Sequence, residues 1–564
     1  MDRKTILAIV LSAMVLIFLP MLLERFGLVP HRESRAPTSA DSLAAESAAV
    51  SRRVGATQLA TPGAADSAAA PGGFVSDLGA QARQLDVSNA LYQVKFNTRG
   101  ARMLGITLPH LKDATGGPVR LAGMPSVVLE LGDDPTKRFL SEAIYEASES
   151  TDAQGNVLRV RFQAEDTSGL RVVQIYTLDP RRYVMALEVR MEGAVARGVT
   201  QYQVRLQSWP LTTERNAQED VNNLQTVCRV GNDIYRHHYN DLRKQARVHA
   251  GAVAWTSVRS KYFSLAVVAD GASAEEARSG LPSEMPPAGS EGNPQGAPPA
   301  HVASTLILPI PPSGSAHRLL IYAGPNDYWG LEKIGHHLED LVDLGWRWLL
   351  PFSRAILRVM IFLHRFIPNY GLVILGLSAL VKIVFHPLTA ASMKSMRAMQ
   401  RIQPEIEKIR KRHADDPQKL NAAVFAMYKE NRVNPMGGCL PLVIQMPVLF
   451  SLYQVFLHAI ELRQAPFMAW ITDLSAPDML FSVMGFPIRV LPVIMFGSAI
   501  LQQRMTPTDP RQIQTMQLMN VFLLVLFYNL PSGLVLYWTI TNLLTAAQQY
   551  LVTHGERPPQ PNAA

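Results

Sequence analysis

The sequence predicts a multi-pass α-helical membrane protein, with an N-terminal anchor and a five-helix core, that also carries a β-sandwich domain outside the membrane. Three observations support this fold class. Long apolar runs occupy the N-terminus and the part of the chain after residue 365. Between residues 85 and 325, apolar and polar residues alternate with the period of half-buried strands. Only 18% of the 564 residues are charged, against about 25% in an average globular chain.

The N-terminal segment 1–24 is predicted to be a transmembrane anchor. Residues 5–23 include no charged side chain, and about 20 apolar residues suffice to cross a bilayer. Charged residues follow directly, without the A-x-A-like site of a cleaved signal peptide, which is the alternative. Because Arg3 and Lys4 precede the run, the N-terminus is expected in the cytoplasm. Residues 25–80, rich in Ala, Ser, Pro and Gly, are expected to be a flexible linker.

Residues 81–325 are predicted to form the β-sandwich. In "LRVRFQAE" and "YVMALEVRM" every second residue is apolar, and turn signals such as "LDPRR" separate these stretches. The Pro-, Gly- and Ser-rich stretch 271–300 is expected to be a long surface loop. The histidines of the domain show no metal-ligand spacing, and no nucleophile motif is present. The domain is therefore expected to serve folding and docking; a groove for a sugar or a peptide is the alternative.

A helical period begins in the region 326–365. From Leu331 to Leu349 apolar residues recur every three or four positions, charged residues take the other side, and two tryptophans add amphipathic rings. This pattern predicts one helix over 328–349 that lies in the membrane interface. An ordinary packed amphipathic helix has the same pattern, and only the position next to the membrane region favours the interface.

The rest of the chain is expected to cross the membrane five more times. The charge-free stretch 512–555 is too long for one crossing of about 30 Å, and "LPSG" breaks it into two helices. The predicted core spans are 366–388, 436–458, 487–503, 513–530 and 533–553. With a cytoplasmic N-terminus, the β domain lies outside and the residues 554–564 form a cytoplasmic tail.

The segment 389–435 is expected to be a cytoplasmic hairpin of two charged helices around "ADDP". Its many Lys and Arg agree with the positive-inside rule; contact with ribosomal RNA is the alternative use of this charge, although no stacking aromatics interleave it. A Met-rich seam fits either varied apolar partners or simple helix packing. Pro435, Gly437 and Gly438 in "NPMGGC" are candidate hinge residues, with an ordinary helix-start loop as the alternative.

Three classes of function fit such a membrane protein. A transporter usually shows inverted repeats, whereas five spans divide poorly into halves and no repeat is visible. A membrane enzyme should place carboxylates or histidines together in or beside the spans, where Asp and Glu are nearly absent; we predict no catalytic residue. Two cysteines, Cys228 and Cys439, cannot build a cysteine metal site. The third class is a protein that handles other polypeptides, which needs apolar sliding surfaces, a polar pocket and a mobile cytoplasmic cover. The sequence offers these parts and favours this class, with a membrane transporter or channel as the alternative.

Several stretches resemble the YidC/Oxa family of membrane protein insertases. The C-terminal ones are "NPMGGCLPLVIQMPVLFSLYQVF", "ELRQAPFMAWITDLS" and "PSGLVLYWTITNLLTAAQQY". "FNTRGARM" at 96–103 resembles the opening strands of the large periplasmic domain of the Gram-negative type. The resemblance implies a periplasmic β-supersandwich, a location in the bacterial inner membrane, and a hydrophilic groove in the five-helix core that opens to the cytoplasm and the lipid.

The resemblance also implies a function and partners. Such proteins insert and fold newly made membrane proteins in the lipid bilayer, alone or with the Sec translocon, and receive them from the ribosome or the signal recognition particle. It implies no cofactor, nucleotide or metal for insertion itself, and no DNA partner is expected. The chain is therefore not expected to be an enzyme.

Lys382, inside the apolar run "GLVILGLSALVKIVFHPLTA", is the candidate groove residue. Members of the family usually carry an arginine shortly before "PLT", so the charge remains here but the bidentate guanidinium does not. Lys382 shares a helix face with Ser378 and His386. Its expected role is to attract acidic substrate segments; snorkelling to the headgroups is the alternative. Other polar lining residues are expected to be Gln445, Thr539 and Asn542. The positions that match substrate contacts of the family are Met446, Leu449, Leu526, Tyr537 and Trp538.

Overall fold

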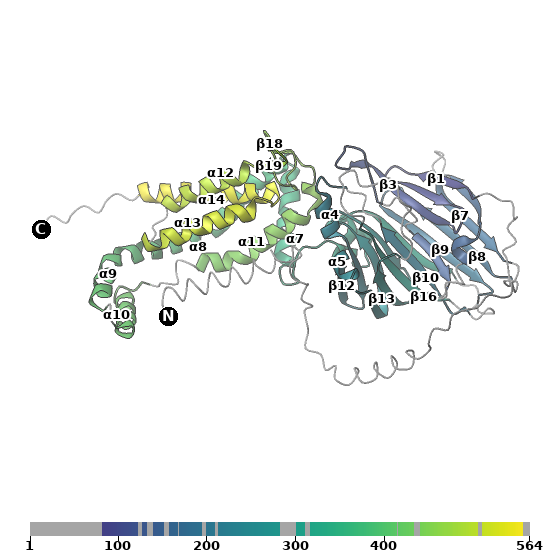
Figure 1. Cartoon of the computed structure of the whole chain (residues 1–564), viewed down its shortest axis with the longest axis horizontal. Helices are drawn as coiled ribbons and strands as arrows, with labels where there is room; N and C mark the ends of the chain where they lie inside the picture. Colours follow the sequence, from purple (N-terminus) through teal and green to yellow (C-terminus); the bar gives the residue numbers. More distant parts are fainter. Residues whose placement is uncertain are drawn as a thin grey trace. The chain divides into compact units, whose positions relative to one another are not determined.

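The computed structural model describes residues 82–555, except 122–126, 132–138, 152–156, 167–168, 195–198, 209–212, 283–299, 311–315, 414–415, 434–439 and 506–509. The predicted anchor, the linker, the C-terminal tail from residue 556 and the three candidate hinge residues lie outside the described residues. The chain divides into two compact units, one made of strands before residue 325 and one made mainly of helices after it (Figure 1).

The first unit is built from a 17-stranded sheet system with three short helices. The strands are β1 (Gln84–Ser88), β2 (Gln93–Asn97), β3 (Arg102–Lys112), β4 (Pro118–Arg120), β5 (Val127–Leu131), β6 (Glu146–Thr151), β7 (Val157–Glu165), β8 (Arg171–Leu178), β9 (Val184–Glu192), β10 (Gln201–Ser208), β11 (Gln225–Val230), β12 (Asp233–His238), β13 (Arg247–Arg259), β14 (Phe263–Ala269), β15 (Ala274–Gly280), β16 (Val302–Pro309) and β17 (Ala316–Pro325). The helices are α3 (Phe139–Glu142), α4 (Ala217–Asn223) and α5 (Tyr239–Leu242).

Two series of antiparallel pairs face each other in this unit. One series runs β6–β7–β8–β9–β17. The other runs β1–β2–β3–β5–β10–β16–β15–β13–β11–β12. The rings of Phe96 on β2, Phe162 on β7 and Tyr176 on β8 meet between them, with centroids 4.8 to 5.9 Å apart. Because the inward residues of β7 and β9 are buried as their alternation requires, as Phe162 and Leu187 show, the predicted β-sandwich is confirmed.

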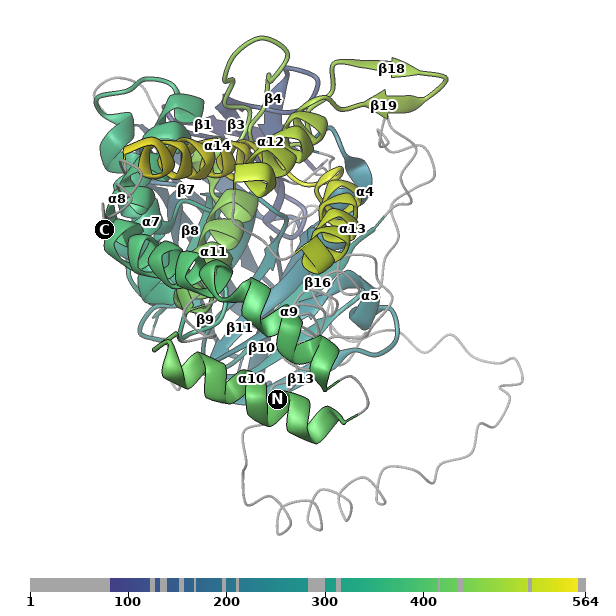
Figure 2. The ribbon, with the colours of Figure 1, turned by 90° about the vertical axis from the view of Figure 1, so that its left-hand side faces the viewer.

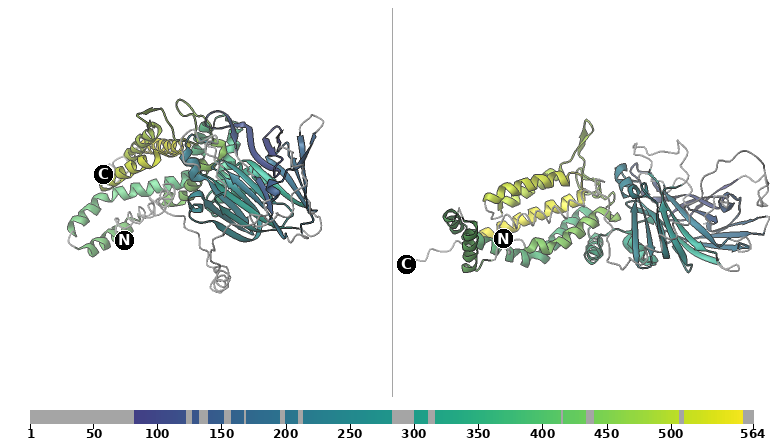
Figure 3. Two further views of the ribbon diagram at one scale, coloured as in Figure 1. Left: turned by 45° about the vertical axis from the view of Figure 1, so that its right-hand side comes forward. Right: turned by 60° about the horizontal axis from the view of Figure 1, so that its bottom comes forward.

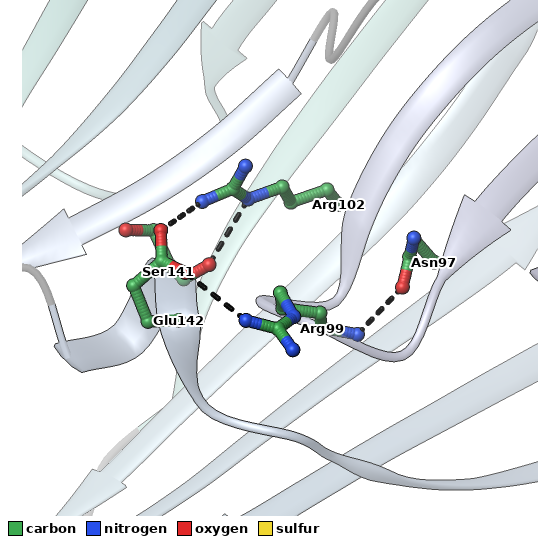
Figure 4. Close-up of polar contacts among 5 residues, drawn as sticks. All are labelled: Asn97, Arg99, Arg102, Ser141 and Glu142. Carbon is green, nitrogen blue, oxygen red and sulfur yellow. Dashed lines mark hydrogen bonds and ion pairs between the residues drawn. The ribbon is translucent and has the colours of Figure 1, made fainter. Parts of the chain in front are cut away.

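The stretch "FNTRGARM" forms a tight turn from β2 to β3 that is bonded to the short helix α3 (Figure 4). The Arg102 guanidinium donates to the Ser141 carbonyl at 3.0 Å and to the Glu142 carboxylate at 2.7 Å. The Gly100 N–H donates to the Ala143 carbonyl at 2.7 Å. A Cβ at Gly100, whose φ is +72°, would lie 2.4 Å from the Ser141 oxygen, so only glycine fits here.

The predicted surface loop 271–300 is wrong over part of its length. Residues Ala274–Gly280 form strand β15, which pairs with β13 and β16. Ala274 and Ala277 are buried, but such small side chains give little hydrophobic contrast, so the period of two was not recognised. Residues 283–299 of the predicted loop lie outside the described residues.

The second unit is helical and carries one small hairpin. Its elements are α6 (Tyr328–Ile334), η3 (Leu338–Leu341), α7 (Leu350–His364), α8 (Tyr370–Arg401), α9 (Gln403–Arg412), α10 (Pro417–Glu430), α11 (Leu440–His458), η4 (Ile460–Leu462), β18 (Phe481–Val483), β19 (Phe486–Ile488), α12 (Leu491–Met505), α13 (Pro510–Phe527) and α14 (Ser532–Gly555). Among the described residues, the segment Tyr370–Met399 of α8 is long and apolar enough to cross a membrane. Helices α8, α11, α12, α13 and α14 run alongside one another (Figure 3).

The prediction of a single helix over 328–349 is also wrong. Helix α6 ends at Ile334, and Gly335, His336 and His337 all adopt positive φ, which an α-helix cannot contain. A short 3₁₀ turn follows before α7 begins at Leu350. Helix α7 is the longer amphipathic helix of this region and packs against α8 and α11. The apolar spacing alone could not reveal the break, because it continues through the turn.

The charged hairpin differs from its prediction at its first helix. The residues Met393–Arg401 continue α8, and α9 begins only after Ile402, with a proline in its first turn. Helices α9 and α10 then pack as an antiparallel pair. Ile402, Ile406, Tyr428 and Val433 form a small buried core, with Met399 and Met427 among the partly buried residues packed against it. The methionine seam therefore contributes to packing within the hairpin.

Candidate functional site

Lys382 joins two helices of the helical unit. Its side chain is half-buried, and its ammonium donates a hydrogen bond of 2.5 Å to the Thr545 hydroxyl on α14. The Thr545 hydroxyl in turn donates to the Thr541 carbonyl, which leaves its oxygen free to accept from the lysine. The lysine thus points across the bundle to a neighbouring helix.

A row of polar residues continues along α14 beside this contact. Thr539, Asn542, Thr545 and Gln549 are buried, and their spacing of three to four residues places them on one helix face. The Asn542 amide donates to the Ser498 hydroxyl of α12 at 3.1 Å. The interior of an otherwise apolar bundle therefore holds polar side chains from α8, α12 and α14.

The other predicted polar residues lie near this row without all joining it. Ser378 is buried, but its hydroxyl donates to the Ile374 carbonyl of its own helix at 2.8 Å, as is common for Ser in apolar helices. Gln445 of α11 lies beside the Tyr537 hydroxyl. His386 is exposed, so the face that starts at Ser378 runs from the bundle interior toward solvent or lipid.

The predicted apolar contact residues divide into buried and half-buried positions. Tyr537 is buried, and its ring lies 5.9 Å from that of Phe456. The Trp538 ring lies 5.1 Å from Phe527. The half-buried residues are Met446, Leu449, Leu526 and Trp538. These four side chains are partly accessible and partly packed.

The loop 459–490 is fastened to the starts of three helices. The Ser532 hydroxyl and N–H at the start of α14 donate to the carbonyls of Asp473 and Ala476 at 2.6 and 2.8 Å. The Asn369 amide before α8 donates to the Phe467 carbonyl at 3.0 Å. Asp478 accepts from the backbone N–H groups that begin α12, at 2.9 and 3.0 Å. These bonds hold the loop over one end of the bundle.

Two glycines permit this close approach of loop and helices. A Cβ at Gly371, in the first turn of α8, would lie 2.0 Å from the Phe467 ring. A Cβ at Gly533, in the first turn of α14, would lie 3.0 Å from the Leu474 carbonyl oxygen. The "PSG" sequence therefore ends one helix, begins the next and leaves room for the loop.

Glu461, in the turn after α11, is the strongly shifted acid of this loop. Burial, together with the negative charge of Asp327, raises the pKa of its carboxyl to about 7. The group therefore titrates near neutral pH, in contrast to an exposed glutamate.

Sequence reasoning missed part of the polar row. Ser498, Thr545 and Gln549 were not predicted, although Thr545 is the partner of Lys382. The available signal was the spacing of Asn542, Thr545 and Gln549 on one face of α14. Ser and Thr are common in apolar helices, so their spacing alone does not distinguish a lining from helix packing.

Family models match most of the chain. The model of the 60Kd inner membrane protein matches residues 362–558, and the model of the YidC periplasmic domain matches residues 84–352. The chain is 30% identical over 581 residues to a membrane protein insertase YidC from Pelobacter propionicus, which covers 98% of this chain and 99% of that protein. It is 31% identical over 488 residues to one from a Geobacter species, strain M21, over 84% of this chain and 86% of that protein.

Solved structures of the same family also match. A crystal structure of an active YidC insertase, with its first transmembrane domain resolved, covers 83% of this chain and 92% of its own. Its sequence is 17% identical to that of this chain, and the TM-score is 0.36. The two family models and the near full-length relatives confirm the resemblance seen in the C-terminal motifs. This chain therefore belongs to the YidC family of membrane protein insertases, inner membrane proteins with a periplasmic domain.

Proposed function

We propose that this chain inserts and folds newly made membrane proteins through a polar groove in its helical unit, lined by α8, α11, α12 and α14. Substrates would come from the ribosome or the signal recognition particle, and the chain would act alone or beside the Sec translocon. The N-terminus and the hairpin of α9 and α10 lie in the cytoplasm in this proposal, and five helices of the unit cross the membrane.

The contact between Lys382 and Thr545 is the observation that carries the proposal. A lysine that snorkels extends along its own helix toward the headgroups. Lys382 instead donates to a hydroxyl of another helix at 2.5 Å, next to the buried Asn542 and Gln549. A charge at membrane depth is costly unless polar groups or water surround it. This setting supports a hydrated lining in which the ammonium can meet a substrate carboxylate.

The loop 459–490 supports a groove that is closed on the periplasmic side. Its bonds to the starts of α8, α12 and α14 would close the end of the bundle that is periplasmic in the proposed topology. Gln549, at the other end of the polar row, lies only two turns before α14 ends. Polar side chains thus reach toward the cytoplasmic end and stop short of the periplasmic one.

The half-buried apolar residues supply the second part of the path. Met446, Leu449, Leu526 and Trp538 lie on α11, α13 and α14. Side chains of this kind can contact apolar helices of different sequence, because Met and Leu adapt to different shapes. The substrate's transmembrane segment would move along these residues while its polar tail crosses the groove.

The basic hairpin of α9 and α10 fits a role as the receiving element. Helix α9 carries Arg410, Lys411 and Arg412 in its last turn, where they also complement the helix dipole. The hairpin has its own small core, so it can move as a unit. We propose Pro435, Gly437 and Gly438 as the hinge.

Reconstitution tests the proposal directly. The purified full chain, placed in liposomes without any Sec component, is expected to insert a short single-span substrate, measured as protection of its tail from added protease. Empty liposomes and liposomes with a Lys382→Leu variant serve as controls. Equal protection in empty liposomes and in liposomes with the chain would refute insertion by the chain alone.

A further inference from the structure

The small hairpin of β18 and β19 exposes nearly all of its apolar side chains. Its sequence, "MLFSVMGFPI" at 479–488, contains no charged residue. Met484 at the tip is fully exposed, and Phe481 and Phe486 are 52% and 61% exposed. A two-stranded ribbon of this length is at most marginally stable in water, and a contiguous apolar surface marks a contact site. Such a surface calls for another apolar phase to cover it.

The root of the hairpin is fixed at the ends of α12 and α13. The Tyr528 hydroxyl donates to the Pro487 carbonyl at 2.7 Å, and the Tyr528 ring stacks on Phe486 with centroids 6.0 Å apart. Arg489, just before α12, donates to the Tyr528 carbonyl at 2.5 Å and lies over the Tyr528 ring. The hairpin thus extends sideways from the ends of these helices, and these contacts hold its base in place (Figure 2).

The two helices also carry exposed apolar residues near the ends that hold the hairpin. Val493 and Ile494 on α12, and Phe522 and Val525 on α13, are exposed apolar residues. In an inner membrane protein such faces meet lipid. Helix α12 has 15 residues, which span about 22 Å at about 1.5 Å per residue. A hydrocarbon core of about 30 Å is thicker than this, so the core extends past at least one end of α12, and the hairpin lies at the start of the helix.

We propose that the hairpin inserts its apolar tip into the outer leaflet of the inner membrane. The inference rests on the proposed topology, in which the loop 459–490 is periplasmic. Each strand of the hairpin has one unpaired edge, and unpaired backbone groups are not tolerated in the hydrocarbon core. The tip therefore lies at the boundary between headgroups and acyl chains, as interfacial elements do. There it anchors the ends of α12 and α13 laterally in the lipid.

Depth-dependent fluorescence quenching tests this placement. A Met484→Cys variant of the full chain, with Cys228 and Cys439 replaced by Ala, is labelled with the environment-sensitive dye NBD. It is placed in nanodiscs of phosphatidylethanolamine and phosphatidylglycerol that carry a doxyl group either near the headgroup or near the end of the acyl chain. Asn232→Cys, in an exposed turn of the β-sandwich, is the matched control and should show neither a blue shift nor quenching.

The expected result is a blue-shifted NBD emission at position 484 that the shallow doxyl lipid quenches more strongly than the deep one. Emission typical of water, or a blue shift that neither doxyl lipid quenches, would overturn the proposal, because the tip would then await another protein or pack on the chain itself. Labelling of Met484→Cys in spheroplasts with a membrane-impermeant maleimide distinguishes a failure of the hairpin proposal from a failure of the proposed topology. Access from outside without lipid quenching contradicts the hairpin proposal only, whereas access only after the cytoplasm is opened contradicts the topology.

Discussion

Replacing Lys382 with leucine should slow the insertion of substrates with acidic tails more than that of substrates with neutral tails. A substrate carboxylate that takes the place of the Thr545 hydroxyl would lie within about 4 Å of the ammonium. Two unit charges at that distance attract by about 1 kcal/mol in bulk water and by about 4 kcal/mol at an effective dielectric constant of about 20. Lys382 is half-buried, so we expect about 2 kcal/mol, which corresponds to roughly a thirtyfold change in rate.

The assay compares matched substrates that differ only in the number of Asp residues in the translocated tail. Lys382→Arg should keep most of the activity, because attraction at a distance does not need the geometry of either headgroup. Thr545→Val keeps the charge and the shape but removes the hydrogen-bond acceptor, and it should change the rates much less than Lys382→Leu. Melting temperatures of all variants in the same lipid control for stability. Equal slowing of acidic and neutral substrates by Lys382→Leu would refute the electrostatic role and leave Lys382 as a structural or snorkelling residue.

Three further predictions concern other parts of the chain. Ile406→Ala should loosen the core of the α9–α10 hairpin by about 2–4 kcal/mol, seen as faster limited proteolysis there, whereas Glu407→Ala at an exposed position of the same helix should not; equal rates would contradict a packed core. Deleting much of 85–320 while keeping the helices from residue 328 onward should leave basic insertion intact, and complete loss in a truncated protein that is stable in the membrane would contradict this. Glu461 has a folded pKa of about 7 against 4.5 for a free glutamate, so the folded state favours its neutral carboxyl. The stability from this preference is fully present below pH 4.5 and is lost as the pH rises through 7. Glu461→Gln should remove this dependence and raise stability at pH 8, by up to about 3 kcal/mol; an unchanged pH profile of the melting temperature would show that Glu461 titrates normally.

The β-sandwich was predictable because its strands alternate strongly. In β7, Val160 and Phe162 are buried between exposed arginines, and this contrast cannot be produced by a helix. Strand β15 has the same geometry but buries alanines, and its Gly- and Ser-rich surroundings resemble a loop. The difference lies in side-chain size and not in the backbone, so a hydrophobicity pattern detects the first strand and misses the second.

Breaks inside continuous apolar patterns were the main failure of the sequence reasoning. The positive φ at His336 and His337 follows the end of α6 at Gly335. That glycine is a local signal for a helix end, but the apolar spacing from Leu331 to Leu341 continues through it. The break after Arg401 has such a signal in Pro404, but the apolar spacing from Met399 to Ile406 runs straight through it. Periodicity reports which residues face the same side and does not report whether the axis turns.

The partner of Lys382 could not be identified from the sequence, yet its chemistry explains how the site can work. The sequences of α8, α11, α12, α13 and α14 contain no Asp or Glu, and the described contact of Lys382 is with the neutral hydroxyl of Thr545. A carboxylate at that position would neutralise the ammonium permanently, because a buried ion pair is costly to separate once formed. A hydroxyl orients the lysine without cancelling its charge. An acidic residue of an incoming tail would then be the first full counter-ion that the lysine meets at membrane depth, and water in a polar lining would keep that pair weak enough to separate.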